Sequence, residues 1–201
     1  MILIRHLLGA TALLLTSLPS MGQLAIKTNL LYDATTTPNL GLEWAVSRKS
    51  SINLVYGLNP WKFSSESHGQ RYAKHWLLMP EYRWWTCTAL DGHFIGVHAM
   101  TGEFNAQNVA LPIPGAFFGG DNITKQVKDS RYEGLYAGLG FTYGYQWALS
   151  KHWNIEAEVG VGYNHVWYRN YNCGTCGAER KKGDTNYAGL TKLGLSIMYI
   201  F

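Results

Sequence analysis

The chain closes with Leu195-Ser196-Ile197-Met198-Tyr199-Ile200-Phe201, and this stretch decides the fold. One parity of the segment holds Tyr187, Gly189, Thr191, Leu193, Leu195, Ile197, Tyr199 and Phe201, and the other holds Ala188, Lys192, Gly194 and Ser196. A strand that is apolar on one face, small or polar on the other and aromatic at its last residue is typical of outer-membrane β-barrels. We therefore predict that Tyr199 and Phe201 form an assembly signal for a barrel assembly machinery.

The first 22 residues have the pattern of a secretory signal peptide. Arg5 and His6 give a weakly basic start, residues 7–18 are apolar, and Ser20-Met21-Gly22 supplies small residues before Gln23. The alternative, a membrane-anchor helix, needs roughly 20 apolar residues, and this run is shorter. The sequence predicts a cleaved signal peptide over residues 1–22 and one mature domain over residues 23–201, with no transmembrane helix.

Eight segments of alternating polarity fill the mature chain, and none has a helical period. They cover residues 24–33, 39–47, 52–58, 75–85, 93–104, 135–147, 153–163 and 187–201. The fifth of them, residues 93–104, is ambiguous in its facing. Pro80, inside the fourth segment, predicts a bulge because proline cannot donate to a sheet. The connections alternate between short ones (47–51, 86–92, 148–152) and long ones (62–74, 105–132, 168–186), and only the first, 34–38, departs from this order.

Short periplasmic turns and long external loops are a property of outer-membrane barrels. We predict an all-β fold: an eight-stranded antiparallel up-and-down transmembrane β-barrel in the outer membrane of a Gram-negative bacterium, with both mature termini periplasmic. A secreted, lipocalin-like barrel is the alternative, and it would turn the opposite face inward. The two folds predict different effects of substitutions at neighbouring positions. In the membrane form, Gly140→Ser should be tolerated better than Leu139→Arg.

Aromatic residues gather near the expected strand ends, where membrane barrels carry two girdles. The periplasmic girdle would contain Trp44, Trp84, Trp147, Trp153, Tyr199 and Phe201. The outer girdle would contain Tyr32, Trp61, Trp76, Phe104, Trp167 and Tyr187. Aromatic residues make up 14% of the chain and charged residues only 15%, against about 25% in soluble domains. The net charge of +4 forms no basic stripe, so we expect no nucleic-acid partner.

A set of charged residues falls on the parity that would face the barrel lumen. It contains Lys27, Glu43, Glu81, Arg83, Glu156, Glu158 and Lys192. Buried charges must be paired, so the sequence predicts a salt-bridged network that plugs the barrel. An ion path, a gate, or acid–base chemistry at Glu156 and Glu158 remain alternatives.

Some small outer-membrane barrels modify lipids or cleave proteins, and such enzymes need a nucleophile, a base and an orienting group close together. The available parts are His98, His165, Ser64, Ser65 and Ser67, with Asp121 or Glu103 as orienting groups. No motif frames any of them. We therefore expect no enzyme activity and no cofactor, and a lipid-modifying enzyme stays the least favoured alternative.

The last long connection carries Cys173-Gly174-Thr175-Cys176, and an oxidising compartment favours a disulfide between its two cysteines. A zinc or redox site is the alternative, but His165 is the only nearby histidine that could complete it. Cys87 has no evident partner and could be a reactive thiol. The run 180–182, Arg-Lys-Lys, could contact lipopolysaccharide phosphates, and the apolar, proline-rich part of 105–132 could cover the mouth or dock a partner.

Several motifs together resemble a family of Bacteroidetes cell-envelope proteins, domain of unknown function 3575. These motifs are Lys27-Thr28-Asn29-Leu30-Leu31-Tyr32-Asp33, Thr37-Pro38-Asn39-Leu40-Gly41-Leu42-Glu43, the Cys-x-x-Cys-Gly of 173–177, Tyr187-x-Gly189-Leu190-Thr191-Lys192 and the final strand. Leu190 stands where the family usually has proline. The resemblance spans the mature chain and implies an outer-membrane barrel, sometimes encoded near fimbrial assembly genes, with no reaction and no catalytic residues.

These observations predict a non-enzymatic outer-membrane protein whose surface loops serve envelope structure or partner binding. A small pore or transport accessory is the second hypothesis. The expected partners are outer-membrane lipids and lipopolysaccharide, the barrel assembly machinery, and, through the resemblance, fimbrial or surface proteins.

Overall fold

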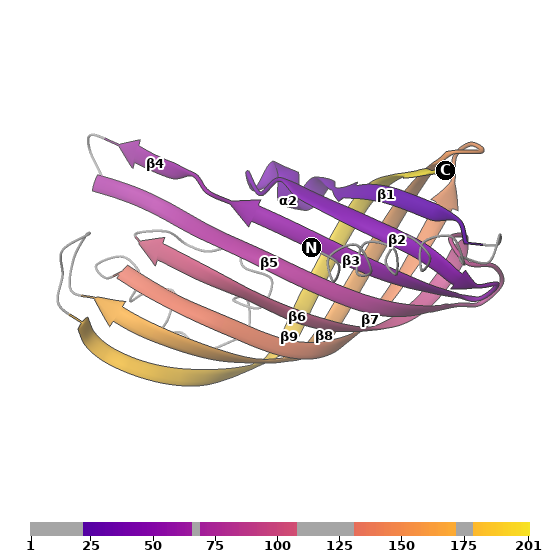
Figure 1. The fold of residues 1–201 in the computed structure, drawn as a ribbon. Coiled ribbons are helices and arrows are strands. Elements are labelled where there is room, and N and C mark those ends of the chain that lie inside the picture. Colours follow the sequence, from indigo (N-terminus) through magenta and orange to yellow (C-terminus); the bar gives the residue numbers. More distant parts are fainter. Residues whose placement is uncertain (1–21, 66–68, 108–130, 172–178) are drawn as a thin grey trace, which may run out of the picture.

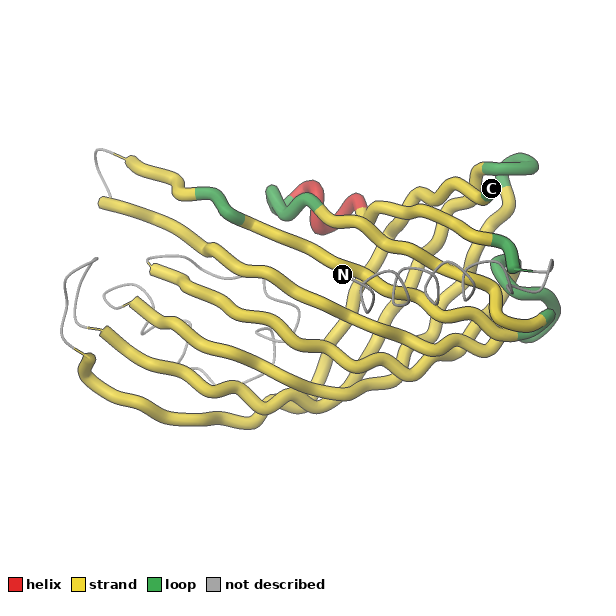
Figure 2. Tube along the Cα trace, viewed as in Figure 1, coloured by secondary structure: helices red, strands yellow, loops and turns green. Residues whose placement is uncertain are grey.

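Eight antiparallel strands form a sheet that closes on itself (Figures 1 and 2), in a computed structural model that describes residues 22–65, 69–107, 131–171 and 179–201. The strands are β1 (Leu24–Asn29), β2 (Asn39–Ser47), β3 (Ser50–Asn59), β5 (Gly69–Trp85), β6 (Gly92–Gln107), β7 (Arg131–Ala148), β8 (Trp153–Tyr171) and β9 (Glu179–Ile200). They follow the order β3-β2-β1-β9-β8-β7-β6-β5, and pairing of β3 with β5 closes the ring. The predicted all-β class and the eight antiparallel strands are confirmed.

The first and last strands form one seam of the ring. Ala25 pairs with Ile200, and the Phe201 N–H donates to the Leu24 carbonyl at 3.0 Å. Both strand ends therefore lie at the end of the ring where the short turns β2–β3, β5–β6 and β7–β8 lie. Pro80 causes no bulge, contrary to the prediction, because the β5–β6 register is the same before it (Leu78↔Thr101) and after it (Glu81↔His98).

The first expected strand is shorter than predicted, because a helix, α2 (Leu30–Ala34), begins directly after β1. The Asn29 side chain accepts a hydrogen bond from the Leu31 N–H at 3.0 Å and so caps the helix. Asparagine favours this position because its side chain replaces a missing backbone partner. The helix turns Tyr32 into the ring, where it is buried.

The alternation of β9 is interrupted by a β-bulge that the sequence did not predict. Gly160 pairs with Lys192 and Val161 with Leu190, so Thr191 is the additional residue on β9. Thr191 and Lys192 are both buried, and the parity of the strand is reversed before this point. Tyr187, expected on the outside, is therefore buried in the interior.

Strand lengths are uneven around the ring. Strands β5 to β9 run on beyond the ends of β1 and β2 at the end with the long connections (Figure 1). β4 (Lys62–Ser65) pairs with β5 there and continues the line of β3. The sheet is therefore a complete ring only over the length of β1, while β9 pairs with β8 alone before Ser196.

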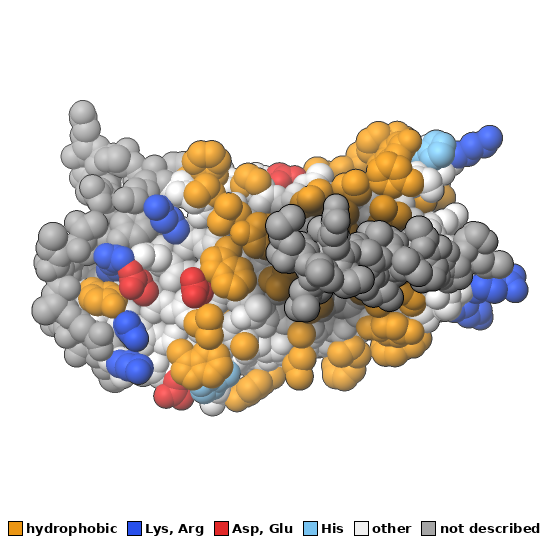
Figure 3. Space-filling view, viewed as in Figure 1, with side chains coloured by type: hydrophobic (Ala, Val, Ile, Leu, Met, Phe, Trp, Pro, Cys, Tyr) orange, Lys and Arg blue, Asp and Glu red, His pale blue; other side chains and the backbone are white. Residues whose placement is uncertain are grey.

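The outer surface of the ring is apolar. Leu139 is 64% exposed and Phe141 is 70% exposed, and Figure 3 shows hydrophobic side chains as a band across the strands with charged ones toward both ends. Trp84, Trp147 and Trp153 are exposed near the short turns, as predicted. Tyr32, Phe104 and Tyr187 do not join an outer girdle, because they pack into the interior. Within the described residues, no helix is long and apolar enough to cross a membrane.

Candidate functional site

Seven charged side chains meet in the middle of the ring, and we call them the ionic layer. They are Lys27 on β1, Glu43 on β2, Glu81 and Arg83 on β5, Glu156 and Glu158 on β8, and Lys192 on β9. All seven are at most 6% exposed. These are the residues that the alternation of the sequence assigned to the lumen, and the structure brings all of them together.

Arg83 is the centre of the ionic layer, because it contacts all four carboxylates. Its Nε lies 2.7 Å from Glu81, Nη1 lies 2.8 Å from Glu43 and 2.6 Å from Glu156, and Nη2 lies 2.8 Å from Glu158. The planar guanidinium offers donors in several directions at once, which a lysine ammonium does not. One face of the guanidinium also lies 4.3 Å from the centre of the Phe94 ring, within reach of a cation–π interaction.

The two lysines each bridge a pair of carboxylates. Lys27 Nζ lies 2.8 Å from both Glu43 and Glu156, and Lys192 Nζ lies 2.7 Å from Glu81 and 2.9 Å from Glu158. Every carboxylate therefore touches Arg83 and one lysine. Because four carboxylates face three cations, neutral donors are needed to complete the network.

Neutral polar groups supply part of this need, and the sequence analysis did not identify them. Ser51 Oγ donates to Glu43 at 2.6 Å, and Asn53 Nδ2 donates to Glu81 at 3.0 Å. Trp85 Nε1 in turn donates to Ser51 Oγ at 2.9 Å. The signal that would have found Ser51 and Asn53 is their parity on β3, opposite the exposed Ile52 and Leu54.

His98 lies beside the ionic layer, fully buried. Its Nδ1 is 2.8 Å from Thr142 Oγ1, and its Nε2 is 2.9 Å from Thr191 Oγ1. Both ring nitrogens are thus held by threonine hydroxyls from β7 and β9. The bulge at Thr191 is what turns that hydroxyl toward the histidine.

Those residues considered for enzymatic chemistry that the structure describes do not form one site. His98 is inside the ring, whereas His165 contacts Asn186 at 2.6 Å and lies 3.8 Å from Asp184 on the outside. Glu103 accepts a hydrogen bond from Trp76 Nε1 at 3.1 Å. Ser64 and Ser65 belong to β4, while Ser67 and Asp121 lie outside the described residues.

An apolar cluster seals the ionic layer on the side of the short turns. It contains Ala25, Ala45, Trp85, Ala89, Leu90, Phe94, Met198 and Ile200. Ala89 and Leu90 come from the β5–β6 turn, which folds into the ring. The Leu90 carbonyl accepts hydrogen bonds from Gln146 at 2.7 Å and from Asn154 at 3.1 Å, and these bonds stabilise the unfavourable positive φ of 66° at Leu90.

A second apolar cluster seals the other side. It contains Tyr32, Val55, Leu77, Met79, Met100 and Tyr136, with Phe104 and Val166 packed against it. Tyr32 reaches it from α2, and the connection after α2 is tied to the wall by Asn59, which donates to Thr37 at 3.3 Å. Between this cluster and the ionic layer remains a cavity of about 10 Å³, room for about one water molecule.

The predicted disulfide partners, Cys173 and Cys176, lie outside the described residues. Cys87 is an exposed thiol in the β5–β6 turn. In the parts of the chain that the structure describes, no three His, Cys, Asp or Glu side chains are grouped so that they could hold a metal ion.

A closed antiparallel ring with an apolar exterior and a buried ionic layer defines the class of this protein. The chain belongs to the family described as "Protein of unknown function (DUF3575)", which matches residues 7–201. No curated protein matches the chain.

Proposed function

We propose that the protein is an outer-membrane β-barrel whose own side chains close its lumen, and that it serves the envelope as a structural or partner-binding protein rather than as an enzyme. The observation that carries this proposal is the polarity of the ring, which is apolar outside and charged inside. A soluble barrel has the reverse arrangement, since its sheet must bury an apolar face.

The outward apolar side chains form a belt around the ring, and the length of this apolar belt along the strands supports a membrane environment. On β8 the outward positions are apolar or aromatic from Trp153 to Tyr163, the length of about 9–11 residues that a tilted strand needs to cross a bilayer. Beyond Tyr163 the outward side chains are His165, Trp167 and Arg169. Soluble monomers rarely expose contiguous apolar patches of more than a few hundred Å².

The orientation follows from the connections. Outer-membrane barrels keep their short turns in the periplasm and their long loops outside the cell. The ends of β1 and β9 lie with the short turns, so both termini of the mature chain are periplasmic in this proposal. The loops at the opposite end are then available to surface partners.

The interior argues for a closed barrel rather than a pore. An eight-stranded barrel is just wide enough for its side chains to fill. Here an ionic layer lies between two apolar clusters, so a hydrated ion would have to break buried salt bridges and enter apolar packing. This arrangement disfavours the alternative of a pore or transport accessory.

The test uses the full-length protein, first in fractionated cells and then purified and folded. We expect it in outer-membrane fractions of the cells, and we expect the purified protein to shift in electrophoretic mobility on heating and to carry no steady ion current in planar bilayers. Reproducible single-channel steps would overturn the closed lumen, and recovery as a soluble periplasmic protein would overturn the membrane assignment. The fimbrial link rests on the family resemblance alone, and unchanged fimbriae in a deletion strain would remove it.

A further inference from the structure

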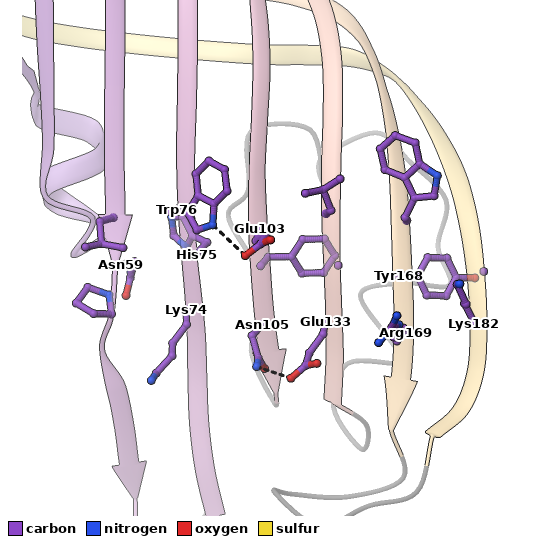
Figure 4. A pocket seen from close by; sticks show the side chains of 17 residues that line it. Asn59, Lys74, His75, Trp76, Glu103, Asn105, Glu133, Tyr168, Arg169 and Lys182 are labelled. Atoms are coloured by element: carbon purple, nitrogen blue, oxygen red, sulfur yellow. Dashed lines mark hydrogen bonds between the residues drawn. The ribbon is translucent and has the colours of Figure 1, made fainter. Parts of the chain in front are cut away.

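A row of polar side chains crosses the outer face of the long strands, and we call it the outer row. It contains Lys74 on β5, Asn105 on β6, Glu133 on β7, Arg169 on β8 and Lys182 on β9. Each is the register partner of the next on the neighbouring strand. Figure 4 shows the five members of the row, labelled, along the long ends of the strands.

Two cations lie directly opposite each other in the outer row. Arg169 pairs with Lys182 across β8 and β9, and both side chains are exposed. Like charges facing each other across a sheet destabilise it unless an anion lies between them. Glu133, the register partner of Arg169 on β7, is already bonded to Asn105 at 2.7 Å and to Arg131. In the described part of the chain, neither Arg169 nor Lys182 has an ion pair.

The next row toward the middle of the strands is aromatic at two of its positions. Trp76 and Trp167 lie there, and Trp167 is 44% exposed. Glu103 between them is held by the Trp76 indole, and Asp184 faces His165, so neither carboxylate neutralises the two cations. Beyond this row the surface is apolar, with Leu139, Val161 and Tyr163 exposed. Cations, aromatic rings and apolar side chains thus follow one another along the strands.

This order of cations, aromatic rings and apolar side chains along the strands matches an amphiphile with an anionic headgroup. We propose that Arg169 and Lys182 bind a phosphate group of a membrane lipid, whose acyl chains lie along the apolar belt below. Arg169 can contact two phosphate oxygens through its planar donors, and Lys182 adds a point charge. The inference rests on the proposed membrane function and names the lipid group that the barrel contacts in the leaflet at its long-strand end.

The experiment compares lipid binding by two double variants of the full-length protein in detergent. Arg169→Gln/Lys182→Gln removes the paired cations. Arg48→Gln/Lys151→Gln removes two exposed cations in turns at the opposite end and is the matched control. The probes are bis-phosphorylated lipid A, the same lipid without phosphates, and inorganic phosphate, each followed by native mass spectrometry.

We expect the wild type and the control variant to retain bis-phosphorylated lipid A equally, and Arg169→Gln/Lys182→Gln to bind it at least about tenfold more weakly, a loss that disappears at high salt. The lipid without phosphates should not distinguish the three proteins. A variant with Lys instead of Gln at position 169, Arg169→Lys/Lys182→Gln, should regain part of the binding that Arg169→Gln/Lys182→Gln loses. Equal retention by both double variants would overturn the proposal. Displacement of the lipid by inorganic phosphate at millimolar concentration would also overturn it, because the site would then be one for free anions.

Fractionation of the same proteins separates this inference from the function on which it rests. If the wild type inserts into outer membranes but the lipid does not distinguish the variants, only the lipid site is wrong. If the wild type is not a membrane protein, the barrel proposal fails first, whatever the lipid measurement gives.

Discussion

The guanidinium of Arg83 connects the two lysine-bridged carboxylate pairs of the ionic layer. Arg83 contacts all four buried carboxylates, so its removal would leave four negative charges with two lysines. We predict that Arg83→Leu lowers the free energy of unfolding by about 3–5 kcal/mol, because the remaining charges stay buried without enough partners. Urea unfolding of the detergent-folded protein, followed by tryptophan fluorescence, measures this loss.

Arg48→Leu is the control for this measurement, since Arg48 is an exposed arginine in the β2–β3 turn. Lys192→Ala should act in the same direction as Arg83→Leu, because Lys192 bridges Glu81 and Glu158. Equal stability of Arg83→Leu and Arg48→Leu would show that water reaches the layer and screens its charges.

Gly140 has less free space beside it than its place on the inner face suggests. Gly140→Ser was expected to be tolerated better than Leu139→Arg, yet a Cβ at Gly140 would lie 2.6 Å from His98 Cε1 and 2.6 Å from the Val161 carbonyl oxygen. We predict that Gly140→Ser lowers the free energy of unfolding by about 1–3 kcal/mol through overpacking. The His98→Ala background should reduce the penalty in the same unfolding assay, and a penalty that stays the same would assign it to the backbone contact alone.

At the scale of the strand, the outward face of β7 and β8 decides between a membrane and water. Leu139→Arg or Val159→Arg places a charge in the middle of the apolar belt, and we predict a loss of about 2–4 kcal/mol for a strand that faces lipid. Leu149→Arg, in the β7–β8 turn and 60% exposed, is the matched control and should cost much less. Refolding into lipid vesicles measures both, and equal costs would contradict a lipid-facing belt.

Strict alternation explains why so much of the fold could be predicted. Along β8, inward Asn154, Glu156 and Glu158 alternate with outward Trp153 and Ile155, and such a pattern is compatible with one register only. The same alternation assigned the seven charges of the ionic layer to the interior. On a strand that obeys this period, the facing of each side chain can be predicted from the strand's own sequence.

Two features that sequence reasoning missed, the helix after β1 and the bulge on β9, break the period. Asn29 replaces a strand with a helix by a local side-chain bond, and Thr191 shifts the parity of β9 by one residue. On β6, small Ala99 and Thr101 on the outside left the facing of His98 ambiguous, so its place beside the ionic layer was not predicted. The outer row is likewise a property of register between strands, which no single strand contains.

For the whole molecule, the last residue belongs to the seam that closes the ring. The Phe201 N–H bonds to Leu24, and its ring packs 5.2 Å from that of Tyr199. We predict that deleting Phe201, or changing it to Ser, sharply lowers the amount of heat-modifiable protein in outer membranes. Trp153→Ser, which replaces another exposed aromatic residue near the same end, is the control. Unchanged levels of the Phe201 variants would contradict the prediction that Phe201 belongs to an assembly signal.

The seam between β1 and β9 also fixes the order of events in folding. Lys27 on β1 must meet Glu156 on β8, and Ala25 on β1 must meet Ile200 on β9. Joining segments so distant in sequence costs chain entropy before any contact compensates it, which makes such steps slow. Synthesis must therefore be finished before the ring can shut, and until then the charges of its interior face water. A chaperone that holds the chain during this delay would meet a protein that is still hydrated on the face it will later bury.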